Sequence, residues 1–100
     1  MKRYVGERTM DGIQVTVDGA PLPERTDIVA LTDTGFEWTY EGSSPTQLAL
    51  ALLADHLGDD TKALALHEVF MRVVVANFGN EWEMTGDDID AALAAISSEG

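Results

Sequence analysis

The sequence contains no cysteine, so disulfide bonds, thiolate metal ligands and a cysteine nucleophile are excluded. It also lacks an apolar run close to the ~20 residues that cross a bilayer. No apolar stretch follows the basic residues of segment 1–8, as a secretory signal would require. We therefore expect a cytoplasmic protein with no membrane association.

Basic residues are scarce. Six oppose eighteen acidic residues, for a formal net charge of −12, and from Thr26 onward only Lys62 and Arg72 are basic. Such self-repulsion destabilises a compact state, and it is screened near molar salt, where the Debye length is ~3 Å. The charge therefore predicts adaptation to high salt. The alternative is an acidic nucleic-acid mimic that binds a basic partner. Direct nucleic-acid binding is disfavoured, because it needs a basic stripe.

The hundred residues predict a single domain, 1–100. Residues 12–18 alternate apolar and polar side chains, and together with residues 3–8 they predict an N-terminal hairpin. The alternation returns in 36–40, which predicts a second strand region, and a short strand is expected at 81–84. Residues 24–34 leave open a short strand or a loop that tucks its apolar side chains inward.

A helix is predicted over 44–57. Ser44 is expected to cap it, Pro45 suits its first position, Gln47 completes a capping box and Gly58 ends it. Its leucines occupy nearly every side, which predicts a buried helix with other elements packed on both sides.

Two further helices are predicted, over 60–78 and 86–97. The β-branched run 73–75 leaves a strand open as an alternative within the first of them. Thr85 and Asp88 form an acidic capping box before the second. The order of elements predicts an α+β fold, a small and mainly antiparallel sheet with about three helices on one face.

Three blocks of sequence carry a resemblance to a known family: KRYVGER at the start, GFEWTY from Gly35, and GSSPTQLALALL from Gly42. They resemble a family of short, uncharacterised proteins of haloarchaea and scattered bacteria, which has no assigned activity and no catalytic residues. The resemblance implies a single domain and a haloarchaeal origin, and it transfers no function. Thr39 and Ser44 stand where the family has glycines. Ser44 is expected to cap the helix that follows, and Thr39 is expected to cost little stability.

His67 is the strongest candidate for chemistry, as a metal ligand or proton carrier with Asp60 on the same helix face. The favoured interpretation is a partly buried histidine satisfied by a carbonyl or by Asp60, because no spacing supplies a second imidazole. His56 is expected to interact with the negative end of its helix.

Other polar clusters have ordinary interpretations. Two acidic clusters could hold Mg²⁺ or Ca²⁺, but neither matches an EF-hand loop, so capping and solvation are favoured. The hydroxyls at 43–46 could hold phosphate, yet the glycines and lysine of a P-loop are missing. The first acidic cluster is Asp55, Asp59 and Asp60, and the second is Asp87, Asp88 and Asp90.

The aromatic residues Phe36, Trp38 and Tyr40 are predicted to share one face of a strand. They could form a stacking platform for RNA, but packing beneath the following helix is the favoured interpretation.

No motif assigns an enzymatic activity, and no catalytic, cofactor-binding or metal-binding residue is assigned. We expect a small, salt-adapted, non-catalytic protein-interaction or regulatory module whose partner is a protein, and its oligomeric state stays open. An exposed apolar patch is expected around 24–34 or on the outer side of helix 60–78. The alternatives are the acidic mimic and a metal-dependent enzyme that uses His67.

Overall fold

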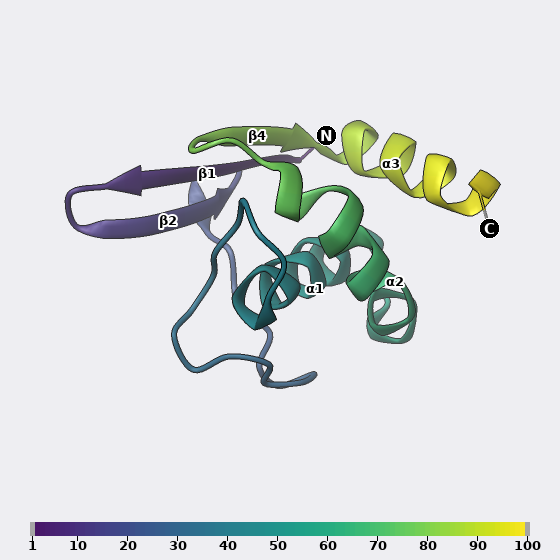
Figure 1. Cartoon of the computed structure of the whole chain (residues 1–100), viewed down its shortest axis with the longest axis horizontal. Helices are drawn as coiled ribbons and strands as arrows, with labels where there is room; N and C mark the ends of the chain where they lie inside the picture. The colour runs from purple at the N-terminus through teal and green to yellow at the C-terminus, as the bar shows by residue number, and fades with distance from the viewer. Residues whose placement is uncertain (1, 100) are drawn as a thin grey trace.

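The chain folds into a four-stranded antiparallel sheet and three helices, the α+β fold expected (Figure 1). This computed structural model describes the backbone of residues 2–99 and the side chains of residues 2–97. The strands lie in the order β3-β2-β1-β4. The elements are β1 (Arg3–Thr9), β2 (Gly12–Val17), β3 (Ala20–Pro21), α1 (Ser43–Leu57), α2 (Asp60–Val73), the 3₁₀ turn η1 (Val75–Asn77), β4 (Trp82–Thr85) and α3 (Gly86–Glu99).

The N-terminal hairpin is confirmed. β1 and β2 pair from Tyr4 opposite Val17 to Thr9 opposite Gly12. The chain then reverses at Asp18, with φ 51°, and β3 adds two residues at one edge of the sheet. The strand expected at 81–84 is confirmed as β4, which pairs with β1 at the other edge.

The strand predicted at 36–40 is wrong, because this segment lies outside the sheet. Thr39 has φ 84°, which bends the chain, and its N–H donates to the carbonyl of Val75 in η1 at 3.3 Å. Trp38 is fully buried whereas Tyr40 is 49% exposed, so these aromatic side chains do not share a face. The alternating pattern reflects a bent segment that buries Trp38.

Thr39 occupies a left-handed conformation that β-branched residues rarely adopt. Threonine in place of glycine at position 39 therefore costs more stability than was expected, since such backbone strain costs about 1–3 kcal/mol. We expect Thr39→Gly to raise the free energy of unfolding by about 1 kcal/mol, measured by urea denaturation. Thr26→Gly, at an exposed residue without positive φ, is the control and should lower it. A loss of stability in both variants would contradict the strain.

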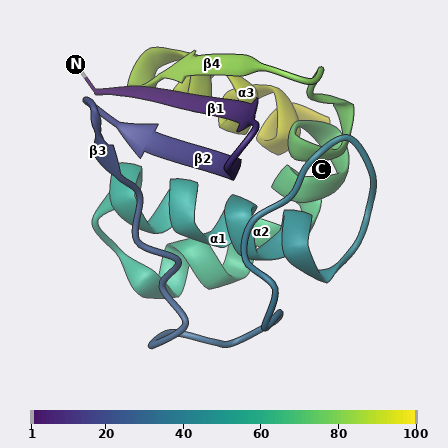
Figure 2. The same cartoon turned by 90° about the vertical axis from the view of Figure 1, so that its left-hand side faces the viewer.

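Helix α1 is buried as predicted, between the sheet on one side and α2 on the other (Figure 2). It ends at Gly58, whose φ of 64° suits the left-handed cap. The predicted capping box is wrong. Gly42 is the N-cap residue, and the Ser44 hydroxyl lies 2.9 Å from that of Thr32 instead. Gln47 also points away from the helix end, into the loop described below.

Helix α2 begins at the predicted cap, because Asp59 accepts a hydrogen bond from the backbone N–H of Lys62 at 3.1 Å. It ends at Val73 rather than at residue 78, and the chain continues as η1. The β-branched run that starts at Val73 weakens helix there. The side-chain amide of Asn77 donates to the Val73 carbonyl at 2.9 Å, which closes the helix end.

Helix α3 starts from the predicted acidic capping box. The Thr85 N–H donates to a carboxylate oxygen of Asp88 at 2.9 Å, and the Asp88 N–H donates to the Thr85 hydroxyl at 3.2 Å. No helix in the described part of the chain is long and apolar enough to cross a membrane.

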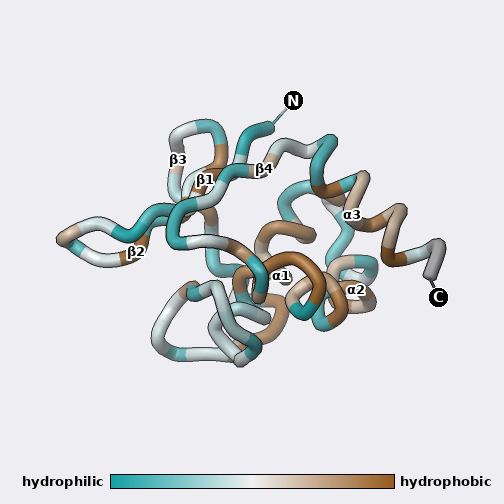
Figure 3. Tube along the Cα trace, turned by 45° about the horizontal axis from the view of Figure 1, so that its top comes forward, coloured by the Kyte–Doolittle hydropathy of each residue, from teal (hydrophilic) through white to brown (hydrophobic). Residues whose placement is uncertain are grey.

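The hydrophobic core lies between the inner face of the sheet and α1, which is brown in the middle of the molecule in Figure 3. Tyr4 of β1, Val15 of β2 and Met84 of β4 face it from the sheet. Trp82 stacks on Phe78, with ring centroids 4.3 Å apart. The core thus joins the strands, α1 and the chain between α2 and β4.

Candidate interaction groove

The loop at 22–42, between β3 and α1, is the most unusual part of the fold. Loops beyond roughly 15 residues without secondary structure are uncommon in compact domains, and many are functional. In Figure 2 its first arm, which follows β3, runs down in front of α1, and its second arm, which contains residues 36–38, rises again past the end of β2. A loop this long needs side chains to hold its backbone in place.

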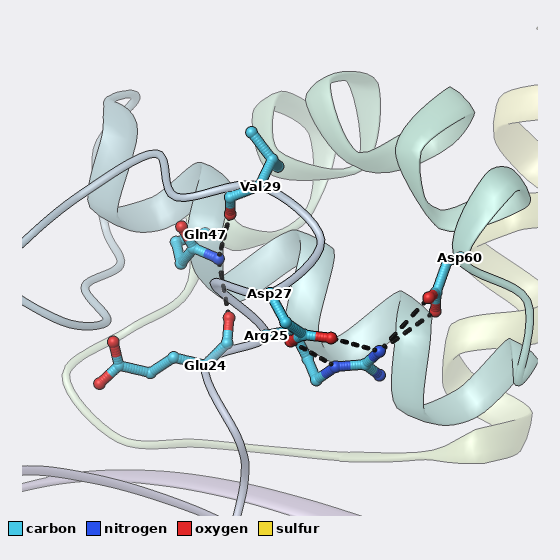
Figure 4. A network of polar contacts seen from close by, with 6 residues as sticks. All are labelled: Glu24, Arg25, Asp27, Val29, Gln47 and Asp60. Atoms are coloured by element: carbon cyan, nitrogen blue, oxygen red, sulfur yellow. Dashed lines mark hydrogen bonds and ion pairs between the residues drawn. The ribbon is translucent and has the colours of Figure 1, made fainter.

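Gln47 supplies the central fixing point of this loop (Figure 4). Its side-chain N–H groups donate to the carbonyls of Glu24, at 2.7 Å, and Val29, at 3.2 Å. Its Oε1 accepts from the N–H of Leu31 at 2.8 Å. Gln47 is fully buried, so these bonds satisfy groups that water does not reach.

Arg25 anchors the first arm of the loop from outside. Its guanidinium lies 3.1 Å from a carboxylate oxygen of Asp27 and 3.4 Å from Asp60 on α2. The hydrogen bond from Arg25 lowers the pKa of Asp27. In Figure 4 the neighbouring Glu24 side chain points the opposite way, and it forms no ion pair with any residue whose side chain is described.

The second arm of the loop is fixed to β1 through Arg8. Its guanidinium forms an ion pair with Glu37 at 2.9 Å and lies 4.8 Å from the ring centroid of Trp38. The hydrogen bond from Arg8 lowers the pKa of Glu37. The Trp38 indole N–H donates to the Asn80 carbonyl at 3.1 Å. The second arm is therefore tied to β1, and the first arm to α1 and α2.

Two adjoining hollows, of about 420 and 510 Å³, lie between these arms and β2, and they share Ile13, Glu24 and Phe36 in their walls. We call the pair the interaction groove. Leu22 and Val15 add apolar surface to the first hollow. Among residues 2–97, no lysine or arginine lines either hollow.

The groove runs along an open edge of β2. Asp18 donates its N–H to the Arg3 carbonyl. The backbone N–H and C=O of every second residue before Asp18 therefore also point toward β1. The backbone N–H and C=O of the intervening residues point toward the β3 side, where the Val15 carbonyl accepts from the Leu22 N–H at 3.0 Å. Ile13 has the same orientation as Val15, but β3 does not reach it. Its N–H and C=O therefore lack a strand partner among the described residues.

The structure explains why β3 stops short of Ile13. Continuing the register of Thr16 opposite Pro21 would place Glu24 opposite Ile13. In that register the Glu24 carbonyl would accept from the Ile13 N–H, but it accepts from the Gln47 side chain instead. The next residue, Arg25, has a φ of 58°, which turns the chain away from a strand path. The chain therefore leaves the sheet just before it would cover this edge.

His67 has the ordinary role that the sequence favoured. It is buried, and its Nδ1 lies 2.6 Å from the Leu64 carbonyl. Asp60 is paired with Arg25 rather than with His67. Among the residues described, no cluster of three or more histidine or acidic side chains is placed to hold a metal ion.

The first acidic cluster is divided among separate partners. Asp55 accepts a hydrogen bond from the buried Tyr4 hydroxyl at 2.6 Å, and it forms an ion pair with Lys2 at 3.1 Å. Burial and then the bond to Asp55 raise the pKa of Tyr4. Asp59 caps α2 and Asp60 holds Arg25, so these carboxylates serve the fold.

Side chains of the second acidic cluster and hydroxyls in the first turn of α1 also contact the rest of the protein. Asp90 lies 2.7 Å from Nε2 of His56 and joins α3 to α1, and Asp88 belongs to the capping box. The Thr46 hydroxyl donates to the Gly42 carbonyl at 2.6 Å. These contacts match the structural interpretation of both sets.

Exposed apolar side chains are isolated rather than gathered into the patch that was expected. Leu64 and Val73 on α2 are nine residues apart and so lie on opposite sides of the helix. Met10 lies in the hairpin turn and Tyr40 in the loop. The groove was not predicted, although the long segment without periodicity before residue 36 was a visible signal.

Comparison with other proteins agrees with the expected membership of a family without an assigned activity. No curated protein and no solved structure matches the chain. A family model matches residues 4–95, from the first strand through most of α3. The chain belongs to DUF6166, a family of unknown function.

Proposed function

We propose that this protein is a non-catalytic interaction module that binds an extended segment of a partner protein in the groove. The observation that carries the proposal is the backbone of Ile13 at the first hollow, whose N–H and C=O have no strand partner among the described residues. A partner strand supplies both missing bonds, which is the mode called β-augmentation.

The shape and lining of the groove favour a peptide over a small molecule. Its apolar wall comes from Ile13, Leu22 and Phe36, and both hollows are partly open to solvent, so a chain segment can reach the edge of β2. Alternate side chains of such a strand point to opposite sides, so one set rests on Phe36 and the other faces solvent. The polar side chains that line these hollows are carboxylates, hydroxyls and one amide, and no histidine, lysine or arginine among the described residues joins them.

The test is an NMR titration of the isotopically labelled protein with a neutral seven-residue peptide that alternates glutamine and valine. We expect shifts at the amides of Ile13, Leu22 and Phe36. Phe36→Ala should weaken binding about tenfold, since buried aromatic anchors dominate such interfaces. Tyr40→Ala is the control, because this exposed aromatic lies outside the groove, and it should leave affinity unchanged. The absence of shifts at the groove would contradict the proposal.

We further propose that the acidic surface is an adaptation to high salt, as the haloarchaeal resemblance implies. Exposed carboxylates lie on strands, loops and helices rather than in the single stripe that a nucleic-acid mimic needs. They are Glu7, Asp11, Asp18, Glu24, Asp27, Asp33, Glu41, Asp60, Glu68, Glu81, Glu83, Asp87, Asp88 and Asp90.

Thermal melts followed by circular dichroism test this adaptation. We expect the melting temperature to rise steeply from dilute buffer to about 3 M KCl, because salt screens the repulsion among these carboxylates. NaCl at the same concentrations is the matched control and should give a similar rise. A melting temperature that salt leaves unchanged would contradict the adaptation and favour a binding role for the charge.

A further inference from the structure

We infer that the segment bound in the groove is basic and places a lysine or arginine beside Glu24. This inference rests on the proposed function and specifies its partner. Three features of the groove carry it: the unpaired carboxylate of Glu24, the acidic balance of the walls and the register of β2.

Glu24 is an exposed carboxylate at the rim of both hollows, and it has no ion-pair partner among the described side chains. Its Oε2 lies 3.8 Å from the position of a Cβ on Gly35, so it reaches toward the opposite arm of the loop. The adjacent cation Arg25 points away and is engaged with Asp27 and Asp60 (Figure 4). A cation in the groove therefore meets no competitor from the protein.

No lysine or arginine among residues 2–97 lines the groove, so no lining side chain would repel a basic segment. Glu37 lines the second hollow, and Arg8 neutralises it from the β1 side. The chain as a whole carries a net charge of −12. A cation in contact with Glu24 acts at short range, which salt screens less than long-range attraction, and such complementarity selects among partners.

The register of the sheet places the cation. Glu24 stands where a continued β3 would face Ile13, but its backbone has left the sheet while its carboxylate remains at the groove. The residue of an added strand opposite Ile13, or its neighbour, therefore comes next to Glu24. A second copy of this chain fits less well, because it brings another −12 to the same edge.

The test compares the neutral glutamine–valine peptide with one in which lysine replaces glutamine. In about 0.05 M salt we expect the lysine peptide to bind about fivefold more tightly, and less so near 1 M salt, where screening is strong. Glu24→Gln should remove most of the difference in affinity between the two peptides. Glu7→Gln removes the same charge from an exposed position on β1 outside the groove, and it should preserve the difference.

The outcomes separate this inference from the proposed function. Equal affinity for both peptides in the native protein would overturn the inference and leave strand binding intact. Failure of both peptides to bind would overturn the proposed function itself. Sedimentation of the free protein as a dimer that peptides dissociate would identify a second copy as the occupant and would also overturn the inference.

Discussion

Replacing Gly6 with alanine is expected to lower the free energy of unfolding by about 3 kcal/mol. A Cβ atom on Gly6 would overlap the indole ring of Trp82 on the neighbouring strand. That ring cannot move aside, because it stacks on Phe78 and meets Trp38 edge-on with centroids 5.7 Å apart. The cost is the strain of an overpacked core, and urea denaturation measures it.

Gly79→Ala is the matched control for this prediction. A Cβ there meets only the Glu81 carbonyl oxygen, at an ordinary 3.8 Å, and the residue has no positive φ. We expect its stability to stay within about 0.5 kcal/mol of the native protein. Equal stability of Gly6→Ala and Gly79→Ala would contradict the packing of Trp82 on β1.

Gln47→Ala should have a similarly large effect, a loss of about 3 kcal/mol. The substitution leaves the carbonyls of Glu24 and Val29 and the N–H of Leu31 without their buried partner. Each unsatisfied buried group costs about 1–3 kcal/mol, which partial solvation of the freed loop reduces. Urea denaturation measures the loss, and hydrogen exchange at 24–31 should accelerate with it.

Gln14→Ala is the control for this effect, because Gln14 is an exposed glutamine on β2. Its stability and its exchange at 24–31 should resemble those of the native protein. A destabilised Gln47→Ala variant without faster exchange at 24–31 would contradict the role of Gln47 in holding the loop.

Local signals predicted most of the fold. The hairpin, the burial of α1 and the capping box of α3 follow from periodicity and from neighbouring residues. Segment 36–40 was misassigned because its pattern cannot reveal the positive φ of Thr39 or the bond from Thr39 to Val75. These features depend on residues distant in sequence.

The groove could not be predicted for the same reason. It exists because Gln47, expected as a capping residue, holds loop residues that lie more than twenty positions earlier, such as Glu24. It also requires that the Glu24 carbonyl bind Gln47 instead of continuing the pairing of β3 to Ile13. Sequence reasoning did place His67 and the acidic clusters in ordinary roles, because those roles depend on helix geometry.

The proposed function depends on the addition of a partner strand at Ile13. Hydrogen exchange of the Ile13 amide, with and without the bound lysine–valine peptide, tests it most directly. We predict that binding slows exchange at Ile13, and that N-methylation of the peptide residue facing Ile13 abolishes binding while methylation of the next residue does not. Unchanged exchange at Ile13 in a peptide-saturated protein, or equal binding of both methylated peptides, would contradict strand addition.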